Sequence, residues 1–500
     1  MIMFKMFHPI IDILLLVMVT MPIIDRIFRR FNIKFALNIY STIGFLLSGF
    51  FLFGLYFEVI SNEVILLGHQ LPWGSAFEID SLGVFMASIF IILGIFASLF
   101  SYRYMEKDSG MAEYYMLLLG MVAGMIGVVF AADFLTFFIF WEIMSLTSYI
   151  LVAFRKHIDV AVEAGVKYLI MSAAGTIALI YGISVFYGIT GSLNFAHISS
   201  VLNGQPENGW LYIPLVMILV GLGIKAAIVP MHTWLPDAHP EAPSTISAML
   251  SGALITVGVY GIIRIFPLMF NPQVYDWTFL IVVLSVVTMT LGNIIALMQN
   301  DLKRLLAYSS IAHIGYALIG VAVADPTGFS SALLHLFNHG IMKGLAFLCV
   351  GSIIYATGTR NLSDLAGIGR RMPVTSGALI IALFALMGFP PLNGFISKYL
   401  LFTSAMNGGL LWLAVVGIVN SIISCGYYLR VFRTLILDPP TKHLDKIRES
   451  PMSMLIPLVV LMLITIIIGV YPVNIIAFSE QAARSALENQ IYIRTVLSHL

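Results

Sequence analysis

Apolar residues run in long stretches along nearly the whole chain, and short polar segments separate them. An α-helix needs about 20 predominantly apolar residues to cross the hydrocarbon core of a bilayer. Runs of this length predict an all-α polytopic membrane protein with fourteen transmembrane helices. The helices are expected at 7–26, 35–60, 81–103, 113–131, 133–154, 160–190, 211–236, 243–270, 277–298, 305–324, 329–357, 373–403, 409–433 and 452–471.

Two segments depart from this pattern. The stretch 58–80 alternates apolar and polar residues and contains Gly68 and Pro72, which predicts a non-helical hairpin on the outer side. The stretch 473–495 is amphipathic, and we expect it to lie at a membrane surface or on a partner protein.

The sequence also predicts that helices 9–13 repeat helices 4–8. Lys225 precedes a proline break and Lys398 follows one, so helices 7 and 12 are expected to be broken. Five helices per unit is an odd number, and consecutive units are therefore expected to be inverted in the membrane. Broken helices in inverted repeats are typical of ion pathways at the midplane. The prolines at the breaks are Pro230, Pro236, Pro390 and Pro391, and a second pair of matching lysines is Lys167 and Lys343.

The expected organisation follows from this repeat. Residues 1–112 hold helices 1–3 and the hairpin, 113–270 the first unit, 277–433 the second unit, and 434–500 the last helix with the amphipathic segment. Counted this way, most Lys and Arg residues fall in the loops of one side. Loops rich in Lys and Arg face the cytoplasm. We therefore expect a multi-pass protein of the cell (inner) membrane with both termini outside.

Composition narrows the class of protein further. The chain is 60% hydrophobic and only 10% charged, whereas soluble domains carry about 25% charged residues. The net charge of +1 gives no basic surface for nucleic acid. Cys349 and Cys425 lack C-x-x-C spacing, which argues against an iron–sulfur cluster or a disulfide framework. No P-loop, dinucleotide fingerprint or H-E-x-x-H motif is present, so we expect no catalytic centre, cofactor or metal in this chain.

Ionisable residues inside the apolar runs are the candidate functional residues. A lysine at mid-membrane depth costs roughly 3 kcal/mol on insertion scales, so Lys225 is rarely explained by packing. Snorkelling to the interface is the alternative. Glu142, near the centre of helix 5, is expected to pair with a lysine on an adjacent helix, most plainly Lys225; a protonated or hydrogen-bonded carboxyl is the alternative. Pro230 frees a backbone carbonyl that could hold water near Lys225.

Helix 11 carries a second set of such residues. His335, His339 and Lys343 stand at i, i+4 and i+8, on one face of a helix, and His313 on helix 10 is expected beside them. Histidine titrates near neutral pH and can relay protons. A zinc or haem site and quiet core histidines are the alternatives. No Asp or Glu lies on this helix to complete a zinc site, and two histidines one turn apart could not be opposite axial ligands of one haem. Lys398 stands directly after the double-proline break of helix 12.

Five stretches together resemble the antiporter-like subunits shared by respiratory complex I, Mrp-type sodium/proton antiporters and membrane-bound hydrogenases. They are FWEIMSLTSYIL, KAAIVPMHTWLPDAHPEAPSTISAMLSGALITVGVYGIIR, DLKRLLAYSSIAHIGYALIG, HLFNHGIMKGLAF and GFPPLNGFISKYL. The resemblance covers nearly the whole chain and implies fourteen helices with inverted repeats. The terminal lysine of helix 12 and the tail NQIYIRTVL look most like the D-type component of Mrp antiporters.

The resemblance also implies roles for particular residues. Glu142 and Lys225 match the family's helix 5 glutamate and helix 7 lysine, and Lys398 matches the terminal charged residue of helix 12. His335, His339 and Lys343 match its helix 11 face. One departure concerns helix 8, where Thr256 replaces a lysine of many relatives and Ser251 a histidine of others. His239, or water along Ser251 and Thr256, is expected to replace that bridge.

The leading hypothesis is therefore an ion-translocating subunit of a multi-subunit membrane complex, either an Mrp complex or a membrane-bound hydrogenase or reductase. It would carry H⁺, Na⁺ or both along buried Lys, Glu and His side chains, with other integral membrane subunits and the lipid bilayer as partners. Two alternatives remain open: a proton-pumping subunit of a complex I-type oxidoreductase, and a stand-alone Na⁺/H⁺ antiporter.

Overall fold

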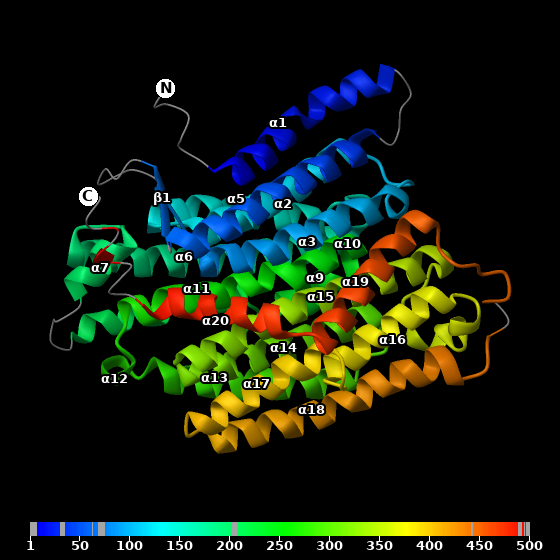
Figure 1. The fold of residues 1–500 in the computed structure, drawn as a ribbon. Coiled ribbons are helices and arrows are strands. Elements are labelled where there is room, and N and C mark those ends of the chain that lie inside the picture. Colours follow the sequence, from blue (N-terminus) through cyan, green and yellow to red (C-terminus); the bar gives the residue numbers. More distant parts are fainter. Residues whose placement is uncertain are drawn as a thin grey trace.

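Long helices lie side by side in one bundle in the computed structural model of the chain (Figure 1). The structure describes residues 8–30, 36–62, 64–68, 76–202, 208–441, 444–488, 493–494 and 496. In these residues the chain is mostly helical, as the sequence predicts. Both chain termini, the predicted hairpin tip at 69–75 and most of the tail motif lie outside the described residues.

The first half of the chain forms the following elements, in order: α1 (Pro9–Arg30), α2 (Ala36–Asn62), β1 (Val64–Gly68), β2 (Ala76–Asp80), α3 (Ser81–Tyr104), α4 (Met111–Phe130), α5 (Phe134–Val152), α6 (Asp159–Thr190), α7 (Phe195–Leu202), η1 (Gly209–Leu211), α8 (Tyr212–Lys225), α9 (Trp234–Glu241), α10 (Ser244–Met249), the π-helix η2 (Leu250–Leu254), α11 (Ile255–Met269) and α12 (Pro272–Tyr275).

The second half forms these elements: α13 (Trp277–Leu297), α14 (Leu302–Val323), α15 (Pro326–Thr357), η3 (Leu362–Leu365), η4 (Ile368–Arg370), α16 (Pro373–Met387), α17 (Asn393–Asn407), α18 (Leu411–Phe432), the π-helix η5 (Arg433–Leu437), α19 (Met452–Val470) and α20 (Val473–Leu487).

In the described residues, eleven helices are long and apolar enough to cross a membrane. A twelfth results if η3 and η4 are joined to α16, from which they are bent by 114°. Three segments expected to span fall short of the criterion, namely α1, the pair α8 and α9, and the pair α16 and α17. Both pairs are helices that the sequence predicts to be broken, and each half is short because the break interrupts it.

The two ends of the bundle differ in character. β1 and β2 pair as an antiparallel hairpin beside the start of α3, and we call this the hairpin end. The opposite end carries Asp108, Arg155, Asp301 and Arg360, and we call it the basic end. The hairpin prediction is confirmed for its strands, but its start was placed too early, because α2 continues to Asn62.

The break after α8 begins earlier than its prolines suggest. α8 ends at Lys225, and residues 226–233 turn before α9 starts at Trp234. The Trp234 indole N–H donates to the Ile224 carbonyl at 2.8 Å and so satisfies one group at the end of α8. Pro236 is not part of the break. It lies in the first turn of α9, where a missing N–H costs no helical hydrogen bond.

The break between α16 and α17 lies where the sequence predicts it, at residues 388–392. Gly388 has a φ of +86° and ends α16 in the left-handed region. Gly394 lies so close to α16 that a Cβ there would be 1.8 Å from the Ala385 carbonyl oxygen. The backbone of the two halves therefore meets at a glycine.

The amphipathic segment after α19, expected at a membrane surface or on a partner, forms α20 over 473–487. α20 packs one face along α3, α11 and α15 of its own chain (Figure 1), while its other face, with Val473 and Glu480, is exposed. The Ser479 and Ser330 hydroxyls lie 2.9 Å apart across α20 and α15. Alanines on the inner face, Ala482, Ala483 and Ala486, allow this close packing, which amphipathic periodicity alone cannot reveal.

Substitution of Gly394 by Ala should destabilise the protein, because its methyl group would overlap the Ala385 carbonyl. We expect a loss of about 1–3 kcal/mol, as for other overpacked sites. Gly377→Ala is the matched control, since it lies in α16 with nothing near its Cβ. Thermal denaturation of the purified protein, followed by size-exclusion chromatography, should show a lower melting temperature for Gly394→Ala only. Equal melting temperatures would contradict the described break.

Candidate functional site

Seven titratable side chains lie buried along the bundle interior, and we call them the lysine axis. Each is at most 4% exposed. They come from α8, α9, α14, α15 and α17, and they are Lys225, His239, His313, His335, His339, Lys343 and Lys398. All seven were predicted site residues, and the fold brings them into the protein interior.

Lys225 is the last residue of α8 rather than the middle of a continuous helix. Cations are favoured at this position because the carbonyl ends of the peptide dipoles point toward it. Its ammonium donates to the Ser145 hydroxyl at 2.8 Å and to the Ser172 hydroxyl at 3.1 Å. The faces of the Trp141 and Tyr168 rings lie 5.3 and 5.4 Å away. Hydroxyls and aromatic rings thus solvate this charge.

Glu142 does not form the direct ion pair with Lys225 that the sequence predicts. Its carboxylate accepts a hydrogen bond from Thr176 of α6 at 2.8 Å, and no ion pair of Glu142 occurs in the described residues. Glu142 is only half-buried, because α5 turns it toward α6 and the bundle surface. The reason is the rotation of α5 about its axis. Ser145, three residues after Glu142, is the side chain that faces Lys225.

Three histidines meet between α14 and α15. The Nδ1 of His313 lies 3.2 Å from the Nε2 of His335, and the two rings stack with planes 9° apart. The Nδ1 of His335 lies 3.0 Å from the Ser397 hydroxyl, next to Lys398 in the chain. The His339 Nε2 lies 3.1 Å from the Ser251 carbonyl. The prediction that His313 lies beside His335 and His339, which are on α15, is confirmed.

The two remaining lysines donate to neutral oxygens. Lys343 donates to the Leu306 carbonyl at 3.0 Å and to the Ser309 hydroxyl at 2.6 Å. Lys398 donates to the Met387 carbonyl at 3.1 Å and lies 4.6 Å from the centroid of the Tyr316 ring. Met387 is the last residue of α16, so the helix break supplies the carbonyl that Lys398 needs.

His239 lies between the basic end and the rest of the axis. Its ring stacks on Phe347 at 4.7 Å, and in the described part of the chain neither ring nitrogen has a hydrogen-bond partner. Polar atoms without partners are costly in a protein interior and are commonly satisfied by water.

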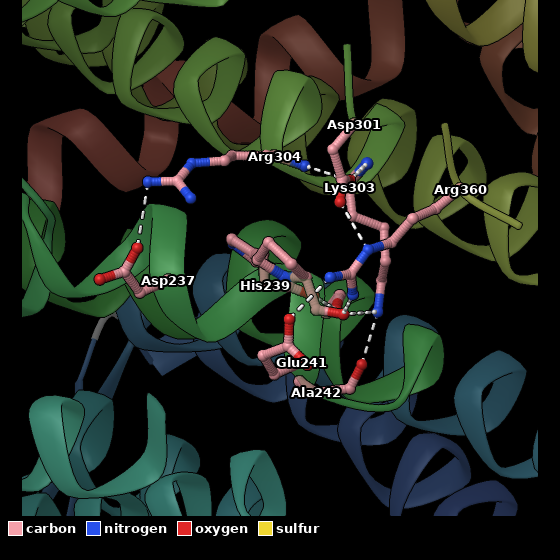
Figure 2. A network of polar contacts seen from close by, with 10 residues as sticks. Asp237, His239, Glu241, Ala242, Asp301, Lys303, Arg304 and Arg360 are labelled. Carbon is pink, nitrogen blue, oxygen red and sulfur yellow. Dashed lines mark hydrogen bonds and ion pairs between the residues drawn. The ribbon is translucent and has the colours of Figure 1, made fainter. Parts of the chain in front are cut away.

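A cluster of charges surrounds the basic end above His239, as Figure 2 shows. Arg360 contacts Asp301 at 2.5 Å and Glu241 at 2.7 Å, and it donates to the Pro240 carbonyl. Lys303 is 2% exposed and donates to the Pro240 and Ala242 carbonyls at the end of α9. No sequence pattern signals the burial of Lys303, because it stands between predicted helices and only two residues after Asp301, which caps α14.

A cavity of about 430 Å³ opens at this cluster. Its lining includes Tyr104, Arg155, Asp301, Lys303 and Arg360. Arg155 is paired with Asp108 at 2.9 Å through two hydrogen bonds. Burial alone would lower the pKa of Arg155, but the hydrogen bond with Asp108 raises it, so this rim stays cationic.

Lys167 is predicted as a member of the ion path, but the structure does not bring it to the lysine axis. Its side chain is 51% exposed and pairs with Glu163 at 2.9 Å and with Asp237 at 3.4 Å. Asp237 also pairs with Arg304 (Figure 2). Apolar helix composition suggested burial, but the outward face of α6 carries this lysine.

The predicted eighth helix, 243–270, forms α10, η2 and α11. It lacks a titratable residue where relatives are expected to have one, and the structure shows which groups lie there. The π-helix η2 contains Ser251, whose hydroxyl lies 2.6 Å from that of Ser310 and whose carbonyl faces His339. A π-helical turn is frequent at functional sites because it displaces backbone hydrogen bonds. Thr256 donates to Ala253 within its own helix. In the described residues no hydrogen bond joins Lys225 to this group.

A buried ion cluster near the hairpin end was missed by the sequence reasoning. Arg264 of α11 donates to Asp80 at 2.7 Å and lies 3.9 Å from Glu78. The Tyr260 hydroxyl links this cluster to the Val129 carbonyl. No sequence pattern joins Arg264 to these carboxylates, because Glu78 and Asp80 lie 184 or more residues earlier in the chain.

Comparison with known proteins gives a consistent result. Residues 131–424 match the family model described as NADH:quinone oxidoreductase/Mrp antiporter, TM, and residues 68–115 match the N-terminus of complex I chain 5. NADH-quinone oxidoreductase subunit N 2 of Chloroherpeton thalassium is 34% identical over 460 residues, which is 89% of this chain and 88% of that protein. The F(420)H(2) dehydrogenase subunit N of Methanosarcina mazei is 31% identical over 81% of this chain and 84% of its own.

A solved structure is similar over the full bundle. A chain of the membrane-bound sulfane sulfur reductase, an archaeal respiratory membrane complex, superimposes with a TM-score of 0.89 at 26% identity. The match covers 97% of this chain and 98% of that one. The similarity therefore extends well beyond the central helices that carry the lysine axis.

Replacement of Arg360 by Met should destabilise the basic end, because Asp301 and Glu241 would lose their shared partner. We expect a loss of about 1–3 kcal/mol. Arg433→Met is the control, since that side chain is 74% exposed and makes one 3.4 Å contact with Asp438. Melting temperatures of the purified variants test this difference. If Arg433→Met lowered the melting temperature as much as Arg360→Met, the effect would come from removing a positive charge and not from the contacts of Arg360.

Proposed function

Because this chain belongs to the NADH:quinone oxidoreductase/Mrp antiporter family, we propose that it is an ion-translocating subunit of a larger membrane complex. It has no catalytic centre of its own in this proposal. Its task is to pass protons along the lysine axis, and Na⁺ is the other ion to be tested.

One observation carries the proposal: three buried lysines have no carboxylate partner in the described residues. Lys225, Lys343 and Lys398 donate only to hydroxyls and carbonyls. A lysine kept for structure would gain most from a permanent counter-charge, because an unpaired buried ammonium is costly. Neutral partners can serve both the charged and the uncharged amine. Such lysines can therefore gain and lose protons.

The order of the groups supports a route for the proton. Water at the cavity of the basic end would reach Lys303 and then His239, whose free ring nitrogens can accept and donate. Lys343 and the three histidines continue the route toward Ser397 and Lys398. Glu142, Ser145 and Lys225 form the gate of the other half, with Ser251 and Ser310 as the bridge on the α15 side.

The surface of α5 and α6 supports membrane partners. Glu142 is half-buried there, and Glu163 and Lys167 are more than half exposed in the isolated chain. Charged groups at membrane depth rarely face lipid. We propose that another integral membrane subunit covers this face. The relatives are named as oxidoreductase and dehydrogenase subunits, which favours a redox-driven complex for this chain too.

The proposal includes the finer architecture. All fourteen expected segments are helical over most of their length, and the breaks at 226–233 and 388–392 each stand beside a buried lysine. This supports fourteen spans and two inverted five-helix units. The basic end would face the cytoplasm of a cell membrane, according to the positive-inside rule.

Substitution of Lys343 by Met in the intact complex should abolish most ion translocation, because the route loses its central titratable group. The complex is purified with its partners, reconstituted in liposomes and energised by the donor of its redox subunits. If none co-purify, a Na⁺ gradient is imposed. A pH-sensitive dye and radioactive Na⁺ report the two ions, and Lys446→Met, in the exposed loop, is the control.

Full translocation by Lys343→Met would refute the proposed function. Exchange by the purified chain alone would instead establish the stand-alone antiporter. Redox-driven proton uptake with quinone reductase partners would favour the complex I type.

Removal of both hydroxyls at Lys225, by Ser145→Ala with Ser172→Ala, should slow translocation about tenfold or more, because hydrogen bonds to charged groups are among the stronger ones. Thr147→Ala is a matched control on α5, since the hydrogen bonds of Thr147 among the described residues stay within its own helix. Initial rates in the same liposomes distinguish the variants. A double variant as fast as Thr147→Ala would show that Lys225 does not depend on these hydroxyls.

A further inference from the structure

A polar cluster between α13, α14 and α18 lies beside the lysine axis and has no part in the route above. Its members are Asn293, Ser309, Tyr316, Tyr427 and Tyr428, and all are at most 1% exposed. None is charged. Buried polar side chains are hydrogen-bonded, and these five bond to one another, to Lys343 and to Asn420 of α18.

The network starts at Lys343. Its ammonium donates to the Ser309 hydroxyl at 2.6 Å, and Ser309 is hydrogen-bonded to the Tyr428 hydroxyl. The rings of Tyr427 and Tyr428 lie side by side with centroids 4.3 Å apart, so their hydroxyls are neighbours. The Tyr427 hydroxyl donates to the side-chain oxygen Oδ1 of Asn293 at 2.9 Å.

The direction of this chain follows from counting protons. A hydroxyl has one proton to donate, and that of Tyr427 is committed to Asn293. Toward Tyr428 and Ser309, Tyr427 can then only accept. The proton of Ser309 therefore points toward the tyrosines, and its lone pairs stay open for the three N–H groups of a protonated Lys343. This series of hydrogen bonds favours the protonated form of Lys343, because its far end, the side-chain oxygen of Asn293, can only accept.

Asn293 cannot easily reverse this direction. Its amide nitrogen donates to the Asn420 backbone carbonyl at 3.3 Å and to the Asn420 side-chain oxygen at 3.2 Å. A flipped amide would place its oxygen against that backbone carbonyl, which cannot donate. The orientation of Asn293 is thus fixed by a main-chain group of α18.

The same amide nitrogen reaches the other lysine. It donates to the Tyr316 hydroxyl at 3.1 Å, and the face of the Tyr316 ring lies 4.6 Å from the Lys398 ammonium. Rings stabilise a cation only when held face-on. One asparagine therefore holds both the last hydroxyl of the Lys343 chain and the ring under Lys398.

We propose that Asn293 is a positioning residue for the two lysines of the second half of the axis. It fixes the direction of the hydrogen-bond chain that holds protonated Lys343, and it keeps the Tyr316 ring in place at Lys398. The amide is not itself a proton carrier. This inference rests on the proposed function and identifies how the site is held.

Other titratable groups also face Lys343. They are His239 of α9, His313 of α14, His339 of α15, Lys398 of α17, and Tyr427 and Tyr428 of α18. Within the described residues none of these is a carboxylate, and a positive charge on any of the histidines or on Lys398 disfavours a cation at Lys343. The oriented hydroxyl chain is the contribution that favours it.

The test measures the pH dependence of ion translocation by the reconstituted complex. Asn293→Leu and Tyr427→Phe remove the terminal acceptor or its donor, so Ser309 can turn its proton toward Lys343. Their alkaline limb should move by about one pH unit to lower pH, the scale expected for a hydrogen bond to a charged group. Asn293→Asp retains an acceptor for Tyr427, so its alkaline limb should not move to lower pH.

Tyr260→Phe is the control, because it also removes a buried tyrosine hydroxyl but lies at the hairpin end. Melting temperatures of all variants show whether the fold is kept; if Asn293→Leu does not assemble, Tyr427→Phe decides. An unchanged alkaline limb in Tyr427→Phe, with translocation still lost in Lys343→Met, would overturn this inference alone. An Asn293→Asp shift equal to that of Asn293→Leu would also overturn it.

Discussion

The cost of a charge in an apolar interior is the constraint on which the rest of this structure depends. A buried ammonium must find oxygen or aromatic partners, and each partner must itself be held by the fold. Lys225, Lys343 and Lys398 each solve this with neutral groups: serine hydroxyls, backbone carbonyls and ring faces. A carboxylate would have bound each proton more tightly but would have made its release harder.

Helix breaks follow from the same constraint. A continuous helix uses all its carbonyls internally, whereas a helix end leaves four without partners. Lys225 lies at the end of α8, and Lys398 takes the carbonyl of Met387 at the end of α16. The π-helical turn at Ser251 offers its carbonyl to His339. Breaks and bulges thus place backbone acceptors at membrane depth, where they line the site and lipid cannot reach them.

Paired charges, by contrast, lie at the two ends of the bundle. Arg360, in the loop after α15, joins the start of α14 to the end of α9 through Asp301 and Glu241, and Arg264 joins α11 to the hairpin through Asp80. The interior has lysines with neutral partners, and the ends have arginines with carboxylates. Arginine stays protonated and binds carboxylates with fixed geometry, whereas lysine loses its proton more readily when buried. The distribution separates structural charges from those proposed to move protons.

The sequence by itself determined the membrane class, the helices, both breaks and six of the seven axis residues by number and helix; His239 was expected only as a substitute bridge. These depend on local signals, because apolar length, proline and i, i+4 spacing act within one helix. Only the tertiary structure decided the partners. It separated Glu142 from Lys225, turned Lys167 outward, buried Lys303 and packed one face of α20 against α15. The register between helices sets each of these outcomes, since a rotation of a fraction of a turn moves a side chain from interior to surface.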